Sequence, residues 1–106
     1  MEFIELQKMT PREMAKGVKV RFVHSGSMTV AYWEIDAGSS VPEHSHPHEQ
    51  IMTVLEGQIT FFLGAETQKM GEGSAVVIQP NVPHGGEAIV NCRLLDVFHP
   101  VREDYR

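Results

Sequence analysis

Glycine and proline interrupt this chain of 106 residues so often that few stretches are free to form a long helix. Nine glycines and six prolines separate short apolar runs, which alternate with polar residues or are rich in β-branched and aromatic residues. Such runs are typical of strands. The segments predicted as strands are 18–23, 28–35, 51–55, 58–63, 67–70, 75–78 and 93–98. Many short strands joined by turns predict an all-β fold, an antiparallel sandwich or a small barrel.

One short helix is predicted near the N-terminus. Thr10 stands three residues before Glu13, and Pro11 occupies the first helical position. This arrangement is typical of a capped helix start, where the missing N–H of proline costs nothing. We expect the helix to end at Gly17.

Three local expectations concern the second half of the chain. Glu56 and Gly57 indicate a tight turn between the strands on either side. The apolar run 75–78 is expected to be a buried strand. The loop 80–83 has a proline at each end, so we expect it to be rigid and to hold His84 in place.

Length and composition predict one globular domain over residues 1–106. The net charge of −5, without a basic run, argues against a general nucleic-acid or membrane-surface binder. Cys92 is the only cysteine, which excludes an intramolecular disulfide and a cysteine-based zinc site. The sequence shows no signal pattern and no apolar run of membrane-spanning length, so we expect a cytoplasmic protein.

Half of the six histidines fall within residues 43–50. In an extended segment the side chains alternate between faces, so every second residue of this stretch points the same way. These residues are His44, His46, His48 and Gln50. Imidazole is the commonest protein ligand for metals near neutral pH, so the stretch predicts a metal site. The alternative is a solvated, histidine-rich loop.

This stretch resembles the first sequence motif of the cupins, in which a glycine precedes His-x-His, an acid and a second glycine at set spacing. The residues that match are Gly38, His44, His46 and Gly57. Gln50 stands where the family usually has a glutamate. A neutral amide at this place leaves the charge of a bound ion uncompensated, which makes the ion a stronger Lewis acid. This departure favours hydrolytic or tautomerising chemistry over dioxygen chemistry.

The second cupin motif is kept only in part. Its opening glycine is Gly73 and its histidine is His84, whereas its proline, glycine and asparagine are replaced at positions 79, 81 and 88. The resemblance implies a cupin jelly-roll barrel with at most one short N-terminal helix. It also implies a homodimer, which we expect to form through edge strands because pairing would cover them.

The cupin resemblance further implies a ligand set for one divalent transition metal. The implied ligands are His44, His46, Gln50 and His84. Imidazole with an oxygen donor suits nickel, zinc, iron, manganese or copper, so the identity of the metal stays open. We expect His48 to lie at the rim or to face outward, and Glu49 to face away from Gln50 by strand alternation.

A narrower resemblance joins the histidine segment to the ending that runs from Leu95 to Tyr105. Together they resemble the pectin-degradation cupins of the KdgF type, which open 4,5-unsaturated monouronates from pectin or alginate to linear keto acids. Residues that line the pocket of that family match Asp96, Phe98 and Arg102. The resemblance implies a metal-dependent enzyme acting on a small anionic sugar acid or a related keto or enol acid.

The same resemblance implies a role for each of these residues. Arg102 would hold the uronate carboxylate by a bidentate pair, Asp96 would move a proton, and Phe98 would pack against the sugar. The alternative is that Asp96 is an ordinary paired carboxylate, Phe98 a core residue and Arg102 a solvated tail residue. Tyr32 and Trp33 are expected in the core or at an interface. Two other functions stay open, a non-catalytic cupin that binds a metal or small ligand and, less favoured, a cupin dioxygenase.

Overall fold

The computed structural model describes residues 2–106, which form ten strands and two short 3-10 helices. The strands are β1 (Arg12–Ala15), β2 (Val18–His24), β3 (Thr29–Ile35), β4 (Ser40–His44), β5 (Glu49–Glu56), β6 (Gln58–Leu63), β7 (Glu66–Gly71), β8 (Ala75–Ile78), β9 (His84–Ala88) and β10 (Cys92–His99). The 3-10 helices are η1 (Leu6–Lys8) and η2 (Glu103–Tyr105). The predicted all-β class is confirmed, and each predicted strand is present.

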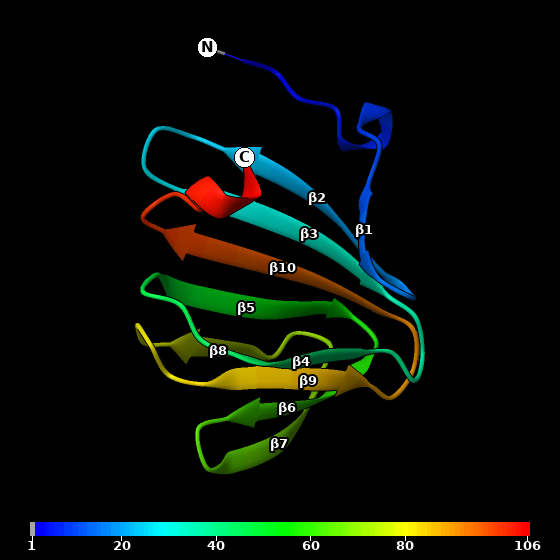
Figure 1. The fold of residues 1–106 in the computed structure, drawn as a ribbon. Coiled ribbons are helices and arrows are strands. Elements are labelled where there is room, and N and C mark those ends of the chain that lie inside the picture. Colours follow the sequence, from blue (N-terminus) through cyan, green and yellow to red (C-terminus); the bar gives the residue numbers. More distant parts are fainter. Residues whose placement is uncertain (1) are drawn as a thin grey trace.

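The strands form two antiparallel sheets that face each other as a sandwich (Figure 1). The six-stranded sheet has the order β1-β2-β3-β10-β5-β8, and the four-stranded sheet has the order β4-β9-β6-β7. The chain crosses from one sheet to the other six times, including the connections from β3 to β4 and from β4 to β5 on either side of the strand that leads into the histidine-rich segment. These crossings bring the histidine-rich segment to the space between the sheets.

The core lies between the sheets and follows the period of two expected for half-buried strands. The buried residues of β2 are Val18, Val20 and Phe22, and those of β10 are Cys92, Leu94, Asp96 and Phe98. Asp96 and Phe98 therefore share the inner face of the six-stranded sheet. A buried carboxylate in this row of apolar side chains is the first indication of a site within the sandwich.

The predicted helix between Thr10 and Gly17 is wrong. Residues Arg12–Ala15 form β1, which pairs with β2 at the edge of the six-stranded sheet. Gly17 has a φ of 75° and turns the chain between the two strands. So short a helix is marginal in water, whereas the edge of a sheet offers backbone partners at once. Strand pairing therefore overrides the capping pattern.

Two expectations in the second half have different outcomes. The tight turn at Gly57 is present, with a φ of 92°, and it joins strands of different sheets. The expectation of a buried strand over 75–78 is wrong. The strand β8 is not a buried strand, because it lies at the edge of the six-stranded sheet and Val77 is 53% exposed. Of its four residues only Ile78 is buried. A short apolar run on an edge strand with one exposed face cannot be distinguished by its sequence from a fully buried strand.

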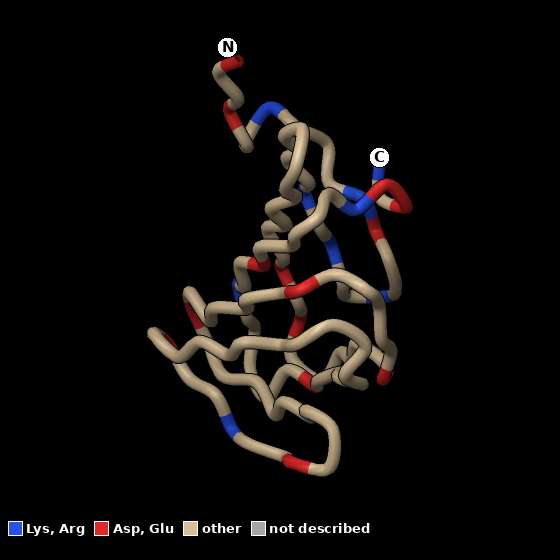
Figure 2. Tube along the Cα trace, turned by 90° about the vertical axis from the view of Figure 1, so that its left-hand side faces the viewer, with Lys and Arg blue, Asp and Glu red and all other residues tan. Residues whose placement is uncertain are grey.

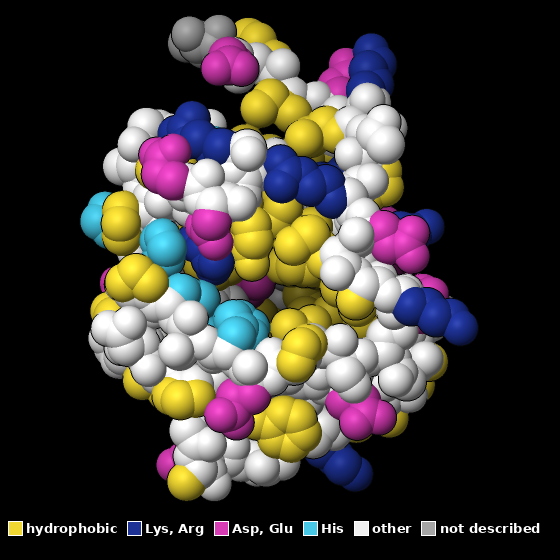
Figure 3. All heavy atoms as spheres, viewed as in Figure 1, with side chains coloured by type: hydrophobic (Ala, Val, Ile, Leu, Met, Phe, Trp, Pro, Cys, Tyr) yellow, Lys and Arg dark blue, Asp and Glu magenta, His cyan; other side chains and the backbone are white. Residues whose placement is uncertain are grey.

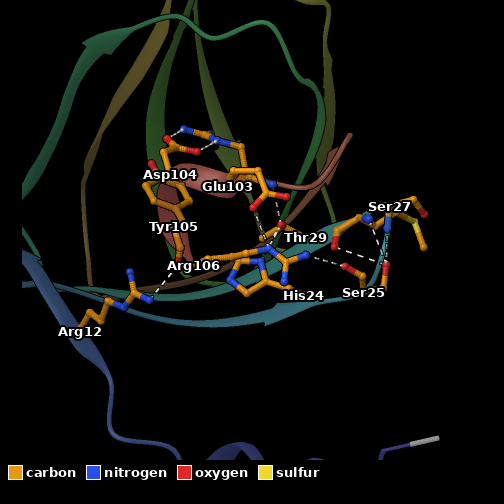
Figure 4. A network of polar contacts seen from close by, with 11 residues as sticks. Arg12, His24, Ser25, Ser27, Thr29, Glu103, Asp104, Tyr105 and Arg106 are labelled. Carbon is orange, nitrogen blue, oxygen red and sulfur yellow. Dashed lines mark hydrogen bonds and ion pairs between the residues drawn. The ribbon is translucent and has the colours of Figure 1, made fainter.

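The tail after β10 folds back against β2 and β3 and is held there by polar contacts (Figures 1 and 4). The hydrogen bonds run from Arg12 Nη2 to the Tyr105 carbonyl at 2.7 Å, from the Arg102 backbone N–H to Thr29 Oγ1 at 2.9 Å, and from Arg106 Nη2 to the Ser25 carbonyl at 3.2 Å. The Tyr105 ring also stacks on Phe22, with ring centroids 4.5 Å apart. The tail thus forms part of the wall of the sandwich.

Charged positions of both signs are interspersed along the chain (Figure 2). The basic positions lie mostly in the half of the molecule that holds the two termini. Within residues 2–106, none of the helices has the length and apolar character needed to cross a membrane.

Candidate functional site

Three histidines meet at one end of the sandwich. His44 ends β4 and His84 begins β9, and the two residues are direct cross-strand partners. His46 lies in the loop that crosses from β4 to β5. One ring nitrogen from each histidine lies within 4.8 Å of the other two, so the three side chains could share one ion.

Each of the three rings is held by a backbone carbonyl two residues away. The Nδ1 atoms of His44, His46 and His84 contact the carbonyl oxygens of Pro42, His48 and Val82 at 2.9, 3.1 and 2.8 Å. A carbonyl oxygen can only accept, so each contact is a hydrogen bond when Nδ1 carries the proton of the neutral ring. In that tautomer the Nε2 lone pair is available, as second-shell carbonyls arrange it in metal-bound histidines.

Gln50 adds an oxygen donor from the opposite sheet. Its Oε1 lies 2.9 Å from His46 Nε2, and in the tautomer with the proton on Nδ1 both atoms present lone pairs to each other. His84 Nε2 is buried and has no hydrogen-bond partner in the described structure. A cation satisfies such atoms where a hydrogen bond cannot. The imidazole and amide donors therefore fit a divalent transition metal.

The surroundings keep the rings of His46 and His84 neutral, the form that binds metal. Burial lowers the pKa of His46 to about 4, and the nearby Arg102 guanidinium adds to the effect. Burial also lowers the pKa of His84, with smaller contributions in the same direction from His44 and Arg102. The two buried rings therefore carry no positive charge at neutral pH.

A cavity of about 200 Å³ opens beside the histidines, between the two sheets. Figure 3 shows a hollow with hydrophobic side chains inside it and histidine side chains along its rim. Its lining includes His44, His84 and Gln50, and from β10 and the tail Asp96, Phe98, Arg102 and Tyr105. All three pocket residues implied by the KdgF resemblance therefore lie at one cavity with the candidate metal ligands.

Asp96 is the buried acid of this cavity. Its Oδ2 accepts a hydrogen bond of 2.9 Å from Trp33 Nε1, while Oδ1 is buried without a partner of good geometry. Burial raises the pKa of Asp96 to about 7, although hydrogen bonding with Gln50 and Trp33 and the charge of Arg102 act in the opposite direction. A carboxyl group of this kind exchanges a proton readily at neutral pH.

Arg102 supplies the positive charge of the cavity. Its guanidinium lies 4.8 Å from the ring centroid of Phe98 and 4.2 Å from that of Tyr105. Its Nε and Nη2 atoms donate to the Asp104 carboxylate at 3.1 and 2.8 Å. Nη1 is buried and has no hydrogen-bond partner in the described structure. The edge of the guanidinium expected to bind a ligand carboxylate in bidentate fashion is thus already taken by Asp104, and Nη1 is the donor left for a ligand.

The other residues of the histidine segment lie outside the cluster. His48 is half-buried, and the carbonyl that orients His46 is its contribution to the site. Glu49 is exposed and points away from Gln50. His99, which is the last residue of β10 and does not belong to the histidine segment, is also exposed.

Three residues shape the cavity in ways that sequence reasoning did not predict. Trp33 holds Asp96, Asp104 pairs with Arg102, and Tyr105 stacks on the Arg102 guanidinium. Trp33 was expected in the core or at an interface, and it has the same parity along β3 as the buried residues Ala31 and Ile35, but its bond to Asp96 was not foreseen. No comparable periodicity exists in the tail, so the positions of Asp104 and Tyr105 had no sequence signal.

Comparison with known proteins decides the family. A family model described as a cupin domain matches residues 31–98, which include the histidine segment, His84 and Asp96. The chain belongs to the cupin family. A protein of Streptomyces coelicolor described as uncharacterized is 28% identical to this cupin over 85 residues, which are 79% of this chain and 81% of the relative.

Solved structures share the whole fold. KdgF from Halomonas sp. is similar over 100% of this chain and 99% of its own, with a TM-score of 0.94 and 23% identity. An RmlC-like cupin from Shewanella frigidimarina is similar over 100% of this chain and 96% of its own, with a TM-score of 0.94 and 22% identity. At these identities the likeness establishes the cupin fold, which hosts many chemistries.

Proposed function

We propose that this cupin is a metal-dependent enzyme that opens 4,5-unsaturated monouronates to linear keto acids. The observation that carries the proposal is the meeting of three groups in one cavity: the histidine cluster, the near-neutral carboxyl of Asp96 and the free Nη1 of Arg102. The resemblance of the Asp96, Phe98 and Arg102 positions to KdgF-type cupins, and the likeness of the fold to KdgF from Halomonas sp., support the choice of substrate.

The cavity suits a single anionic sugar. Its volume of about 200 Å³ lies below the usual range for ligand pockets, which favours a monosaccharide over an oligomer. The Nη1 atom of Arg102 donates to the uronate carboxylate, and Phe98 packs against the face of the sugar. Asp104 and the two aromatic rings keep the guanidinium in place before the ligand arrives.

The reaction is an isomerisation, so the protein needs only to move protons. The C1 hydroxyl of the substrate loses a proton, the C1–O5 bond breaks, and O5 stays on C5 as an enolate. Transfer of a proton to C4 then gives the C5 ketone beside a C1 aldehyde. Asp96 takes the first proton and supplies the second, because its pKa lets both forms exist near pH 7. A divalent metal held by His44, His46, Gln50 and His84 supplies Lewis acidity to the ligand oxygens when bound.

The test is incubation of the metal-loaded protein with 4,5-unsaturated galacturonate, following the loss of the ultraviolet absorbance of the alkene. We expect loss well above the spontaneous rate. Asp96→Asn should slow it by about 10²–10⁴-fold, the usual contribution of a positioned acid or base. Arg102→Ala should chiefly raise KM, and Lys69→Ala, at an exposed position of β7, should change neither constant. Loss at the spontaneous rate only, or full activity in Asp96→Asn, contradicts the proposal.

A further inference from the structure

Two buried groups of opposite charge line the cavity without forming an ion pair. Asp96 and Arg102 are 6% and 5% exposed, and both belong to the lining. The Arg102 guanidinium lies over the ring of Phe98, which follows Asp96 on the same face of β10, about 7 Å along the strand. Burial raises the pKa of Asp96, and the guanidinium is close enough to act against this rise. The ion pairs among residues 2–106 nevertheless do not include Asp96 with Arg102.

The separation of these two groups runs against their attraction. Opposite charges attract strongly in the interior of a protein, because the effective dielectric constant there is low. A pair between Asp96 and Arg102 would also give a partner to two buried atoms that lack a hydrogen bond in the described structure, Asp96 Oδ1 and Arg102 Nη1. Such a pair would occupy the group that moves protons and the group that binds an anion at the same time. The cavity would then be blocked by its own charges.

Each of the two groups has a partner of its own instead. Trp33 Nε1 donates to Asp96 Oδ2 at 2.9 Å. The Asp104 carboxylate accepts from Nε and Nη2 of Arg102 at 3.1 and 2.8 Å. The two partners come from separate parts of the chain, β3 and η2. Each partner occupies one side of its group and leaves a single atom, Oδ1 or Nη1, for another contact.

We propose that Trp33 and Asp104 are positioning residues that keep Asp96 and Arg102 from pairing with each other. With both partners in place, Nη1 can donate to the acidic group of a ligand, while Oδ1 meets its hydroxyl groups. Without either partner, the released group pairs with the other charge, and a ligand must break that pair to bind. The inference rests on the proposed function for the roles of Asp96 and Arg102, and it adds two residues that act only through them.

The first test is the binding of acetate, a small carboxylate, to the Zn²⁺-loaded protein, followed by NMR titration. Asp104→Ala should raise the dissociation constant at least about fivefold, because acetate must then displace Asp96 from the guanidinium. Glu103→Ala is the matched control and should change nothing. Glu103 lies in the same short helix and pairs with Arg106 at 3.1 Å, but it does not line the cavity.

The direction of the change decides between two roles for Asp104. If Asp104 only occupied donors of Arg102, its removal would free these donors and tighten acetate binding. An unchanged or lower dissociation constant in Asp104→Ala therefore overturns the proposal. A wild type that does not bind acetate also overturns it, because Nη1 is then not available to a ligand.

The second test removes the competing carboxylate. In the Asp96→Asn background, Asp104→Ala should no longer weaken acetate binding, because no charge is left to pair with Arg102. Trp33→Phe keeps an aromatic ring but loses the N–H, so it should weaken binding in the wild-type background and not in Asp96→Asn. Tyr32→Phe, on the other face of β3, is its control, and circular dichroism checks that each variant folds. Losses that persist in Asp96→Asn contradict the proposal.

Acetate binding needs no turnover, so these results separate the inference from the proposed function. A protein that follows the expected pattern with acetate but leaves 4,5-unsaturated galacturonate unchanged contradicts the proposed function alone. Equal acetate affinities in all variants, as binding to the metal alone would give, contradict the inference alone. Where the reaction occurs, Asp104→Ala should chiefly raise KM, whereas Trp33→Phe should lower kcat as well, because Asp96 loses its orientation.

Discussion

Arg102 shows how a terminal arginine becomes part of a binding cavity. It is only 5% exposed, and burial of a guanidinium is costly unless its charge is paired and its faces are covered. Asp104 pairs two of its nitrogens, and the rings of Phe98 and Tyr105 cover its plane. Of the three guanidinium nitrogens of Arg102, Nη1 is thus the one without a hydrogen-bond partner in the described structure, and we expect it to bind a ligand.

The ion pair of Arg102 with Asp104 should make stability depend on acidity. Hydrogen bonding and charge from Arg102 hold the pKa of Asp104 below its ordinary value of 3.8. The pair therefore stabilises the fold above that pH, and its contribution is lost as the pH falls through the lowered value. Asp104→Asn should lower the free energy of unfolding by about 1 kcal/mol at neutral pH, a modest amount because the carboxylate is half exposed.

Urea unfolding of both proteins at pH 7 and at pH 3 measures this difference. The difference between wild type and Asp104→Asn should begin to narrow at the lower pH, because Asp104 binds a proton more readily in the unfolded chain than in the folded protein. A difference that is constant with pH would mean that shape or packing, and not charge, accounts for the effect of the substitution.

The sequence predicted the positions of some side chains and not those of others. The spacing of His44, His46 and Gln50, and the proline-bounded loop before His84, suggested that these side chains gather, and the structure places them together. Their role as metal ligands stays a prediction. The Trp33–Asp96 hydrogen bond joins residues 63 positions apart, and the placement of the tail depends on contacts with β2 and β3. Such long-range contacts leave no local pattern.

At the level of elements, the predicted strands were located either by a period of two, which burial of one face imposes, or by runs of β-branched and aromatic residues. The same pattern could not say which strands pair. The chain at Gly57 turns from one sheet to the other, a choice made by the packing of the whole sandwich. The N-terminal capping pattern failed for a similar reason, because the free edge of β2 competed for residues 12–15.

We expect the turn at Gly57 to tolerate a side chain less well than the turn at Gly73. Its φ is 92°, and a Cβ there would meet the backbone carbonyl oxygen of Asn91, which cannot move aside. Gly73 is a matched control, since its φ is 84° but nothing lies within 4 Å of its Cβ position. We expect Gly73→Ala to lower the free energy of unfolding by about 1 kcal/mol, the cost of left-handed backbone alone.

Gly57→Ala should cost at least about 2 kcal/mol more than Gly73→Ala, because overpacking adds to the same backbone cost. Chemical denaturation of the two variants under identical conditions gives the comparison. Equal losses would show that the backbone near Asn91 yields, and that the turn between the sheets is less constrained than its geometry indicates.

For the molecule as a whole, the candidate metal site joins the two sheets. His44 and His84 belong to the four-stranded sheet, Gln50 belongs to the six-stranded sheet, and His46 lies on the loop between them. An unfolded chain does not hold these donors together, so an ion that binds them binds the folded state alone. Metal binding and stability are then linked by mass action.

Metal should therefore raise the midpoint of thermal unfolding, and it should do so only when the ligands are intact. A metal concentration 100 times the dissociation constant stabilises a folded state by about 2.7 kcal/mol. We expect Ni²⁺ or Zn²⁺ to shift the midpoint of the wild type and of His48→Ala alike, because His48 contributes only its carbonyl. Gln50→Ala and His84→Ala should lose most of the shift, since each removes one donor from a set of four. Equal shifts in all four proteins would show that the ion binds elsewhere, and equal loss in all three variants would show that His48 belongs to the ligand set.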